Sequence, residues 1–107
     1  MFKIDRSPEF TLDVPIPEPG AEDQPTIKAR FRAVSEERLN AADWLDVESI
    51  KEFLRDVILE LSDVVDEAGE AVPFGRELLD RVLAIPYARV GLMRAYGEAL
   101  SGLRRGN

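Results

Sequence analysis

A change in hydrophobic period near residue 35 constrains the fold of this chain more than any other feature. Before it, residues 10–16 and 26–34 alternate between apolar and polar or charged side chains, as half-buried strands do. After it, apolar residues recur at helical spacing, most regularly from Ile50 to Leu61. The sequence therefore predicts an α+β fold in which an N-terminal antiparallel β-hairpin packs on three or four α-helices.

Several residues fix the expected form of the hairpin. Pro15 and Pro17 confine the first strand to a sheet edge, because proline cannot donate to a ladder. The acidic segment 18–25 contains two prolines and a glycine, which is typical of an exposed loop. The resulting register would place Glu9 or Asp13 near the basic side chains of the second strand. A two-stranded hairpin is marginally stable alone, so helices should cover its apolar face.

The first two helices are expected from residue 35 onward, and the end of the second is left open, because Val64 and Val65 have strand-like character and Gly69 must break any regular helix. Ser35 can cap a short helix that ends near Ala42, after which Trp44 and Leu45 should turn into the core. The strongest helix begins at Asp46 or Ser49. Its apolar stripe follows the spacing i, i+3, i+4, i+7, i+8, i+11 and consists of Ile50, Phe53, Leu54, Val57, Ile58 and Leu61.

The last two helices are separated by Pro86, which ends one helix and can begin the next. The third is expected over roughly residues 76–84. The fourth runs to about Ser101 with Gly102 as its terminator, and its inward residues should be Val90, Met93, Tyr96, Gly97 and Leu100. We expect one domain over residues 1–107, with a hairpin region at 1–34, a helical region at 35–103 and a short basic tail at 104–107.

The charge of the chain disfavours polyanionic partners. Its 107 residues carry 21 Asp and Glu against 14 Lys and Arg, a formal net charge of −7. Such a chain is repelled by phosphate backbones and anionic lipids, and it has no apolar run of the ~18 residues that span a bilayer. We therefore expect a cytoplasmic protein that binds neither nucleic acid nor membrane.

The residue types also argue against an enzyme. The chain has neither cysteine nor histidine, which removes thiolate nucleophiles, imidazole acid–base chemistry and the commonest zinc ligands. The largest acidic cluster lacks the ligand spacing of a calcium loop, and a solvated turn is the favoured interpretation; its members are Glu60, Asp63, Asp66, Glu67 and Glu70. The expectation is a non-enzymatic protein without cofactor or metal.

Three cations of the second strand are a first candidate surface for a protein partner. Lys28, Arg30 and Arg32 alternate with apolar residues and would share one face of the strand. They can meet an acidic partner. Solvation and protection of a sheet edge is nevertheless the more common role of such charges.

The fourth helix is the second candidate surface, because it carries apolar or small residues on more than one side. Its candidate contact residues are Leu92, Met93, Tyr96 and Leu100. The helix pair around Pro86 also has the outline of a helix-turn-helix, but Arg89 and Arg94 alone are a weak electrostatic footprint for DNA. A packing helix is the favoured interpretation.

Several segments, read in order along the chain, resemble a known family. They are a Phe-x-Leu-x-Val-x-Ile-Pro strand at residues 10–17, DVVDEAGEAVPF at 63–74, Ile-Pro at 85–86, and ARVGLMRAYGEALSG at 88–102. Together they make nearly the whole chain similar to the tail assembly chaperones of long-tailed bacteriophages and prophages. The most specific part is residues 63–74 followed by the Ile-Pro pair at 85–86 and by Ala95-Tyr96.

The resemblance implies a non-enzymatic protein that escorts the long, aggregation-prone tape measure protein while the tail tube assembles, and that leaves before the virion is complete. The implied partner is the tape measure protein, with the tail tube protein as a second candidate, and a homo-oligomer is left open. Tape measure helices would lie in an apolar groove between the long helix and the last helix. The alternatives are a small regulatory or adaptor protein and a structural tail component retained in the virion.

Overall fold

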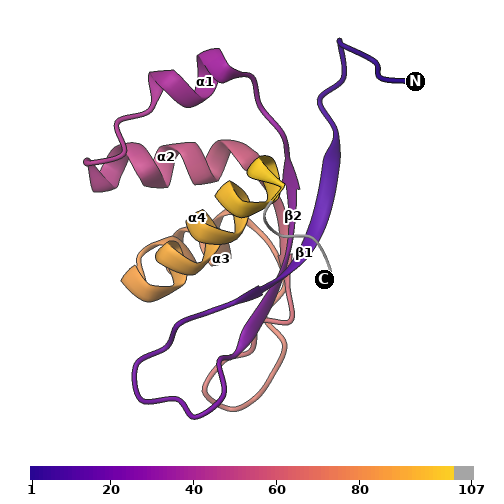
Figure 1. Cartoon of the computed structure of the whole chain (residues 1–107). Helices are drawn as coiled ribbons and strands as arrows, with labels where there is room; N and C mark the ends of the chain where they lie inside the picture. Colours follow the sequence, from indigo (N-terminus) through magenta and orange to yellow (C-terminus); the bar gives the residue numbers. More distant parts are fainter. Residues whose placement is uncertain (103–107) are drawn as a thin grey trace.

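A computed structural model describes residues 1–102 of the chain. Within them the chain forms one antiparallel sheet and four helices (Figure 1). The strands, in spatial order, are β1 (Glu9–Pro15), β2 (Thr26–Arg32) and β3 (Ile58–Ser62). The helices are α1 (Glu36–Ala41), α2 (Val47–Val57), α3 (Arg76–Leu83) and α4 (Pro86–Ser101). The predicted α+β class and N-terminal hairpin are confirmed, and the predicted tail at 104–107 lies outside the described residues.

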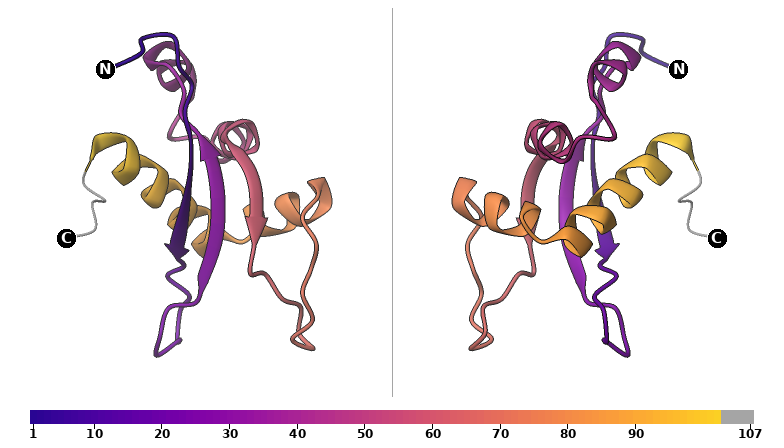
Figure 2. Two further views of the ribbon diagram at one scale, coloured as in Figure 1. Left: turned by 90° about the vertical axis from the view of Figure 1, so that its right-hand side faces the viewer. Right: turned by 90° about the vertical axis from the view of Figure 1, so that its left-hand side faces the viewer.

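The helices of the described chain gather on one face of the sheet, and the opposite face is open (Figures 1 and 2). The core lies between the sheet and α2, α3 and α4, whereas α1 buries no residue completely. All elements except α1, and the residue after β1, contribute to it: Val14, Ile16, Ala29, Phe31, Phe53, Leu54, Val57, Ile58, Leu61, Leu78, Leu79, Val82, Leu83, Ala88, Leu92, Ala95 and Tyr96.

The register of the hairpin agrees with the charge pattern of its strands. β1 pairs with β2 from Glu9 opposite Arg32 to Pro15 opposite Thr26. The carboxylate of Glu9 accepts a hydrogen bond of 2.7 Å from Arg30 on the open face of the sheet. The prediction that an acidic residue of the first strand lies near the basic side chains of the second is therefore confirmed for Glu9.

The long helix is shorter than the sequence predicts. α2 ends at Val57, and Ile58 begins β3 rather than another helical turn. Arg30 pairs with Glu60 and Phe31 with Ile58, so Leu59 is an extra residue in the β3 side of the ladder. Such a bulge reverses the alternation of side chains along a strand. Ile58 and Leu61, three residues apart, consequently both face the core, and the helical period continues into a strand.

Asp46, rather than Ser49, caps α2. The Asp46 carboxylate accepts a hydrogen bond of 3.0 Å from the backbone N–H of Ser49. The Ser49 hydroxyl instead accepts from the backbone N–H of Asp43 at 2.8 Å. Of the two starting points that the sequence left open, the structure selects the earlier one. The predicted cap of α1 by Ser35 is confirmed by a bond from the Arg38 N–H.

The buried face of α4 consists mainly of small residues, and the sequence prediction of its inward face is wrong in part. The buried residues are Ala88, Gly91, Leu92, Ala95 and Tyr96. Among the predicted inward residues only Tyr96 is fully buried. Met93 is half-buried, and Val90, Gly97 and Leu100 are exposed. The physical reason is the close approach of α4 to the end of β1, which only small side chains permit.

Gly91 is the point of closest approach. A Cβ added there would lie 3.0 Å from the carbonyl oxygen of Pro15 and 3.1 Å from side-chain carbons of Ile16 and Pro17. At Gly97, in the same helix, a Cβ would meet nothing within 4 Å. The two glycines therefore separate the effect of packing from the effect of helix propensity.

We expect Gly91→Val to lower the free energy of unfolding by about 1–3 kcal/mol, because the added side chain overpacks the contact with β1. Gly97→Ala should raise it by about 0.5–1 kcal/mol, because alanine is the better helix former. Urea unfolding followed by circular dichroism measures both. Equal changes in the two variants would contradict the packing role of Gly91.

Candidate protein-binding surfaces

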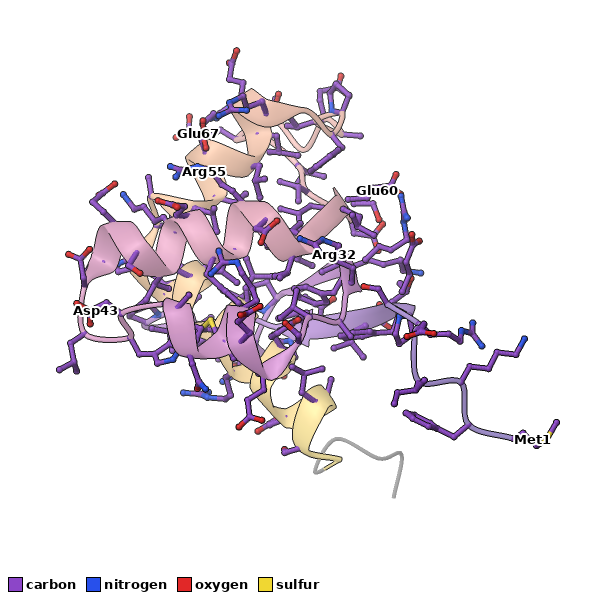
Figure 3. All side chains as sticks on the ribbon, turned by 90° about the horizontal axis from the view of Figure 1, so that it is seen from above. Met1, Arg32, Asp43, Arg55, Glu60 and Glu67 are labelled. Carbon is purple, nitrogen blue, oxygen red and sulfur yellow. The ribbon has the colours of Figure 1, made fainter. Side chains whose placement is uncertain are left out.

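The three cations of β2 do not form one patch. Lys28 is exposed on the open face of the sheet. Arg30 lies between two carboxylates, with Glu9 at 2.7 Å and Glu60 at 3.5 Å. Arg32 points elsewhere and bonds to Asp56 in the last turn of α2 (Figure 3). The open face is therefore a mixed-charge surface rather than a basic one.

Asp56 connects three elements of the fold. Its carboxylate accepts from the guanidinium groups of Arg32 in β2 and Arg38 in α1, the latter at 2.8 Å, and its backbone carbonyl accepts from Arg32 Nε at 3.0 Å. The hydrogen bond from Arg38, followed by that from Arg32 and the charges of both, lowers the pKa of Asp56 below its ordinary value of 3.8 against an opposing effect of burial. Arg38 also lies 5.0 Å from the centre of the Phe53 ring. Asp56 therefore fixes α1, which has little core contact of its own.

We expect Asp56→Asn to lower the free energy of unfolding at pH 7 by about 1 kcal/mol, the scale of a partly exposed charged pair. Because the folded pKa is lowered, the stabilising contribution is present above the unfolded pKa and is lost as pH falls through the folded pKa. The wild type should thus lose stability more steeply than the variant below pH 4. Urea unfolding at a series of pH values measures this. Asp23→Asn in the exposed loop is the control, and identical pH profiles for wild type and Asp56→Asn would contradict the prediction.

Two of the four candidate residues of α4 are not available to a partner. Leu92 and Tyr96 are each 0% exposed, and the Tyr96 hydroxyl donates a 2.9 Å hydrogen bond to the backbone carbonyl of Arg32. Burial raises the pKa of Tyr96. Met93 is half-buried and Leu100 is 39% exposed. The predicted groove between the long helix and the last helix is thus filled by core side chains, which include Phe53 packed edge-on against Tyr96 at 5.5 Å.

The turn between α1 and α2 exposes three apolar side chains, two of which the sequence pattern assigned to the core. Leu45 is 97% exposed, Val47 45% and Trp44 40%. The prediction that Trp44 and Leu45 turn inward is therefore wrong for Leu45. Trp44 contacts the core, because its ring centre lies 4.9 Å from that of Phe53 with the two planes at 75°. We call Trp44, Leu45 and Val47 the apolar corner.

Hydrogen bonds hold the backbone of the apolar corner in place. The Asp43 carboxylate accepts from the N–H of Leu45 at 3.0 Å, and the Asp43 carbonyl accepts from the N–H of Asp46 at 3.2 Å. The bonds from Asp43 to Ser49 and from Ser49 to Asp46 close the same turn from the other side. These contacts fix the direction of Leu45 without covering it. The sequence contains a pattern that could have predicted this turn. Two aspartates flank an apolar pair, and a serine follows six residues after the first aspartate.

A second group of exposed apolar side chains lies in the N-terminal segment. Met1, Phe2 and Ile4 are 122%, 91% and 83% exposed. In Figure 3, Met1 and Asp43 lie at opposite sides of the molecule, so this segment and the apolar corner are separate surfaces. This segment precedes the first strand and makes few contacts with the core.

The acidic cluster predicted to be a solvated turn has a local structural role. The Asp66 carboxylate accepts from the backbone N–H groups of Ala68 and Glu70, both at 2.9 Å, and Gly69 adopts a positive φ of 82°. Within residues 1–102, no three acidic side chains come together in a way that could hold a metal ion. Across the same residues, every helix is too short or too polar to traverse a bilayer.

Comparison with protein-family models, curated proteins and solved structures finds no match. The structure itself defines a small α+β protein with an open, mixed-charge sheet face and an exposed apolar corner.

Proposed function

We propose that this chain is a non-enzymatic phage tail assembly chaperone, which binds the tape measure protein and keeps it soluble while the tail tube assembles. The proposal starts from the resemblance of residues 10–17, 63–74 and 85–102 to that family. Its partner would be a long helical chain, whose apolar stripes need cover until assembly is complete.

The observation that carries the proposal is the apolar corner. Leu45 is almost fully in solvent, on a turn whose backbone is held by hydrogen bonds. A folded protein gains nothing within its own core from such a side chain, whereas a rigid, exposed apolar anchor is suited to binding a partner because little entropy is lost on association. The surrounding net charge of −7 would keep the complex of carrier and partner soluble.

Co-expression with the tape measure protein of the same phage tests the proposal. The expected result is that the tape measure protein becomes soluble and co-elutes with the chain in size-exclusion chromatography, and that mass spectrometry of purified virions does not detect the chain. Failure of both co-elution and solubilisation would contradict the function. Abundance in the virion would instead identify a structural tail component.

A further inference from the structure

The N-terminal segment and the chain that leads from β2 into α1 lie at the end of the sheet opposite the two long loops (Figure 1). Residues of both segments line a pocket. Its volume is about 480 Å³. Three arginines line it: Arg6 from the N-terminal segment, Arg32 from the end of β2 and Arg38 from α1. In a chain of net charge −7, three arginines lining one pocket are an unusual local concentration of positive charge.

Many N–H groups of these arginines have no partner within the described chain. A guanidinium has five N–H donors. Arg32 uses its Nε and one terminal nitrogen on Asp56, and Arg38 uses its Nε on the same residue. Arg6 makes no hydrogen bond or ion pair within residues 1–102. The arginines that line the pocket therefore have N–H groups that remain available to donate hydrogen bonds to a ligand. Asp56 holds Arg32 and Arg38 in position.

The charge balance of the pocket selects the ligand. Two carboxylates are close to the three arginines, Asp5 in the lining and Asp56 behind it. The arginines therefore exceed these carboxylates by one positive charge. A single carboxylate neutralises this charge, whereas a doubly charged phosphate would leave an excess negative charge on an already acidic protein. The lining also includes two apolar residues, Ile4 and Val34, which can contact apolar neighbours of that carboxylate.

We propose that this pocket binds a carboxylate side chain of a partner protein, presented in a short segment with apolar residues beside it. Arg6 and Arg38 would supply charge-assisted hydrogen bonds to the carboxylate, and Ile4 and Val34 would contact its neighbours. The site is separate from the apolar corner and does not depend on the identity of the protein as a chaperone.

Fluorescence anisotropy with a rhodamine-labelled Ala-Leu-Glu-Leu-Ala amide peptide at 0.15 M salt tests the site. The expected result is that this peptide binds at least about 5-fold more tightly than the same peptide with Gln in place of Glu, because only the carboxylate makes charge-assisted bonds. Inorganic phosphate should compete no better than acetate. Equal binding of the two peptides, or stronger competition by phosphate, would overturn the proposal.

Arg6→Ala is the variant of choice because Arg6 is exposed and has no partner in the described chain, so the fold should be unaffected. It should weaken binding of the Glu peptide about 5-fold and leave the Gln peptide unchanged. Lys3→Ala removes the same charge from the same segment outside this pocket, and it should bind as the wild type does. If Arg6→Ala and Lys3→Ala weaken binding equally, the effect is general electrostatics and the site is refuted.

Discussion

Replacing Phe53 with alanine is expected to lower the free energy of unfolding by about 3–5 kcal/mol. Phe53 is fully buried in α2 and forms an aromatic cluster with Trp44 and Tyr96, whose ring centres lie 4.9 Å and 5.5 Å from its own. The variant would lose this buried surface and leave a cavity that its neighbours cannot fill. Since domains of this size are stable by about 5–15 kcal/mol, little stability would remain. Urea unfolding monitored by circular dichroism measures the loss.

Phe2→Ala is the matched control, because it makes the same chemical change at a side chain that is 91% exposed. It should change the free energy of unfolding by less than about 0.5 kcal/mol. A loss below about 1 kcal/mol for Phe53→Ala would mean that the space between α2 and α4 collapses readily and that this cluster is not the centre of the core.

Leu45→Asp is expected to weaken binding of the tape measure protein at least about 10-fold while the free energy of unfolding stays within about 0.5 kcal/mol of the wild type. Leu45 contributes almost no buried surface to the free protein, so the substitution costs the fold little. In the complex, the carboxylate would be desolvated in place of an apolar anchor. Isothermal titration with a soluble tape measure fragment measures the affinity.

Val65→Asp is the control for added negative charge, since Val65 is 59% exposed and lies in the loop after β3, away from the apolar corner. If it weakens binding as much as Leu45→Asp does, the corner has no special role. If wild-type protein binds but Leu45→Asp binds equally well, the proposed function stands and the contact surface lies elsewhere. Absence of binding by the wild type would refute the function itself.

The hairpin was predictable because the alternation that identifies each of its strands lies within a few neighbouring residues. Alternation identified both strands, and the position of Glu9 opposite the cations of β2 is confirmed by its hydrogen bond to Arg30. β3 was not predictable from periodicity. The bulge at Leu59 puts Ile58 and Leu61 on one side at a spacing that a helix would also produce. Only the ladder with β2, a contact between residues distant in sequence, distinguishes the two structures.

The candidate surface on α4 also depends on contacts between residues that are distant in sequence. The sequence offered Leu92 and Tyr96 as contact residues because α4 has apolar or small residues on more than one side. The end of β1 instead packs against Gly91, and the inward face of α4 buries Ala88, Leu92, Ala95 and Tyr96. Which side of such a helix faces inward depends on how closely its neighbour approaches, and composition alone does not encode that distance.

The direct junction between α2 and β3 has a mechanical consequence. No loop residue separates Val57 from Ile58, so the helix axis passes into the sheet without a flexible joint. The turn that carries the apolar corner lies at the far end of α2 (Figure 1). The bonds of Asp56 to Arg32 and Arg38 hold the helix near the junction. We therefore expect binding of a partner at Leu45 to be coupled through α2 to the pairing of β2 with β3, because no loop residue separates the helix from the strand.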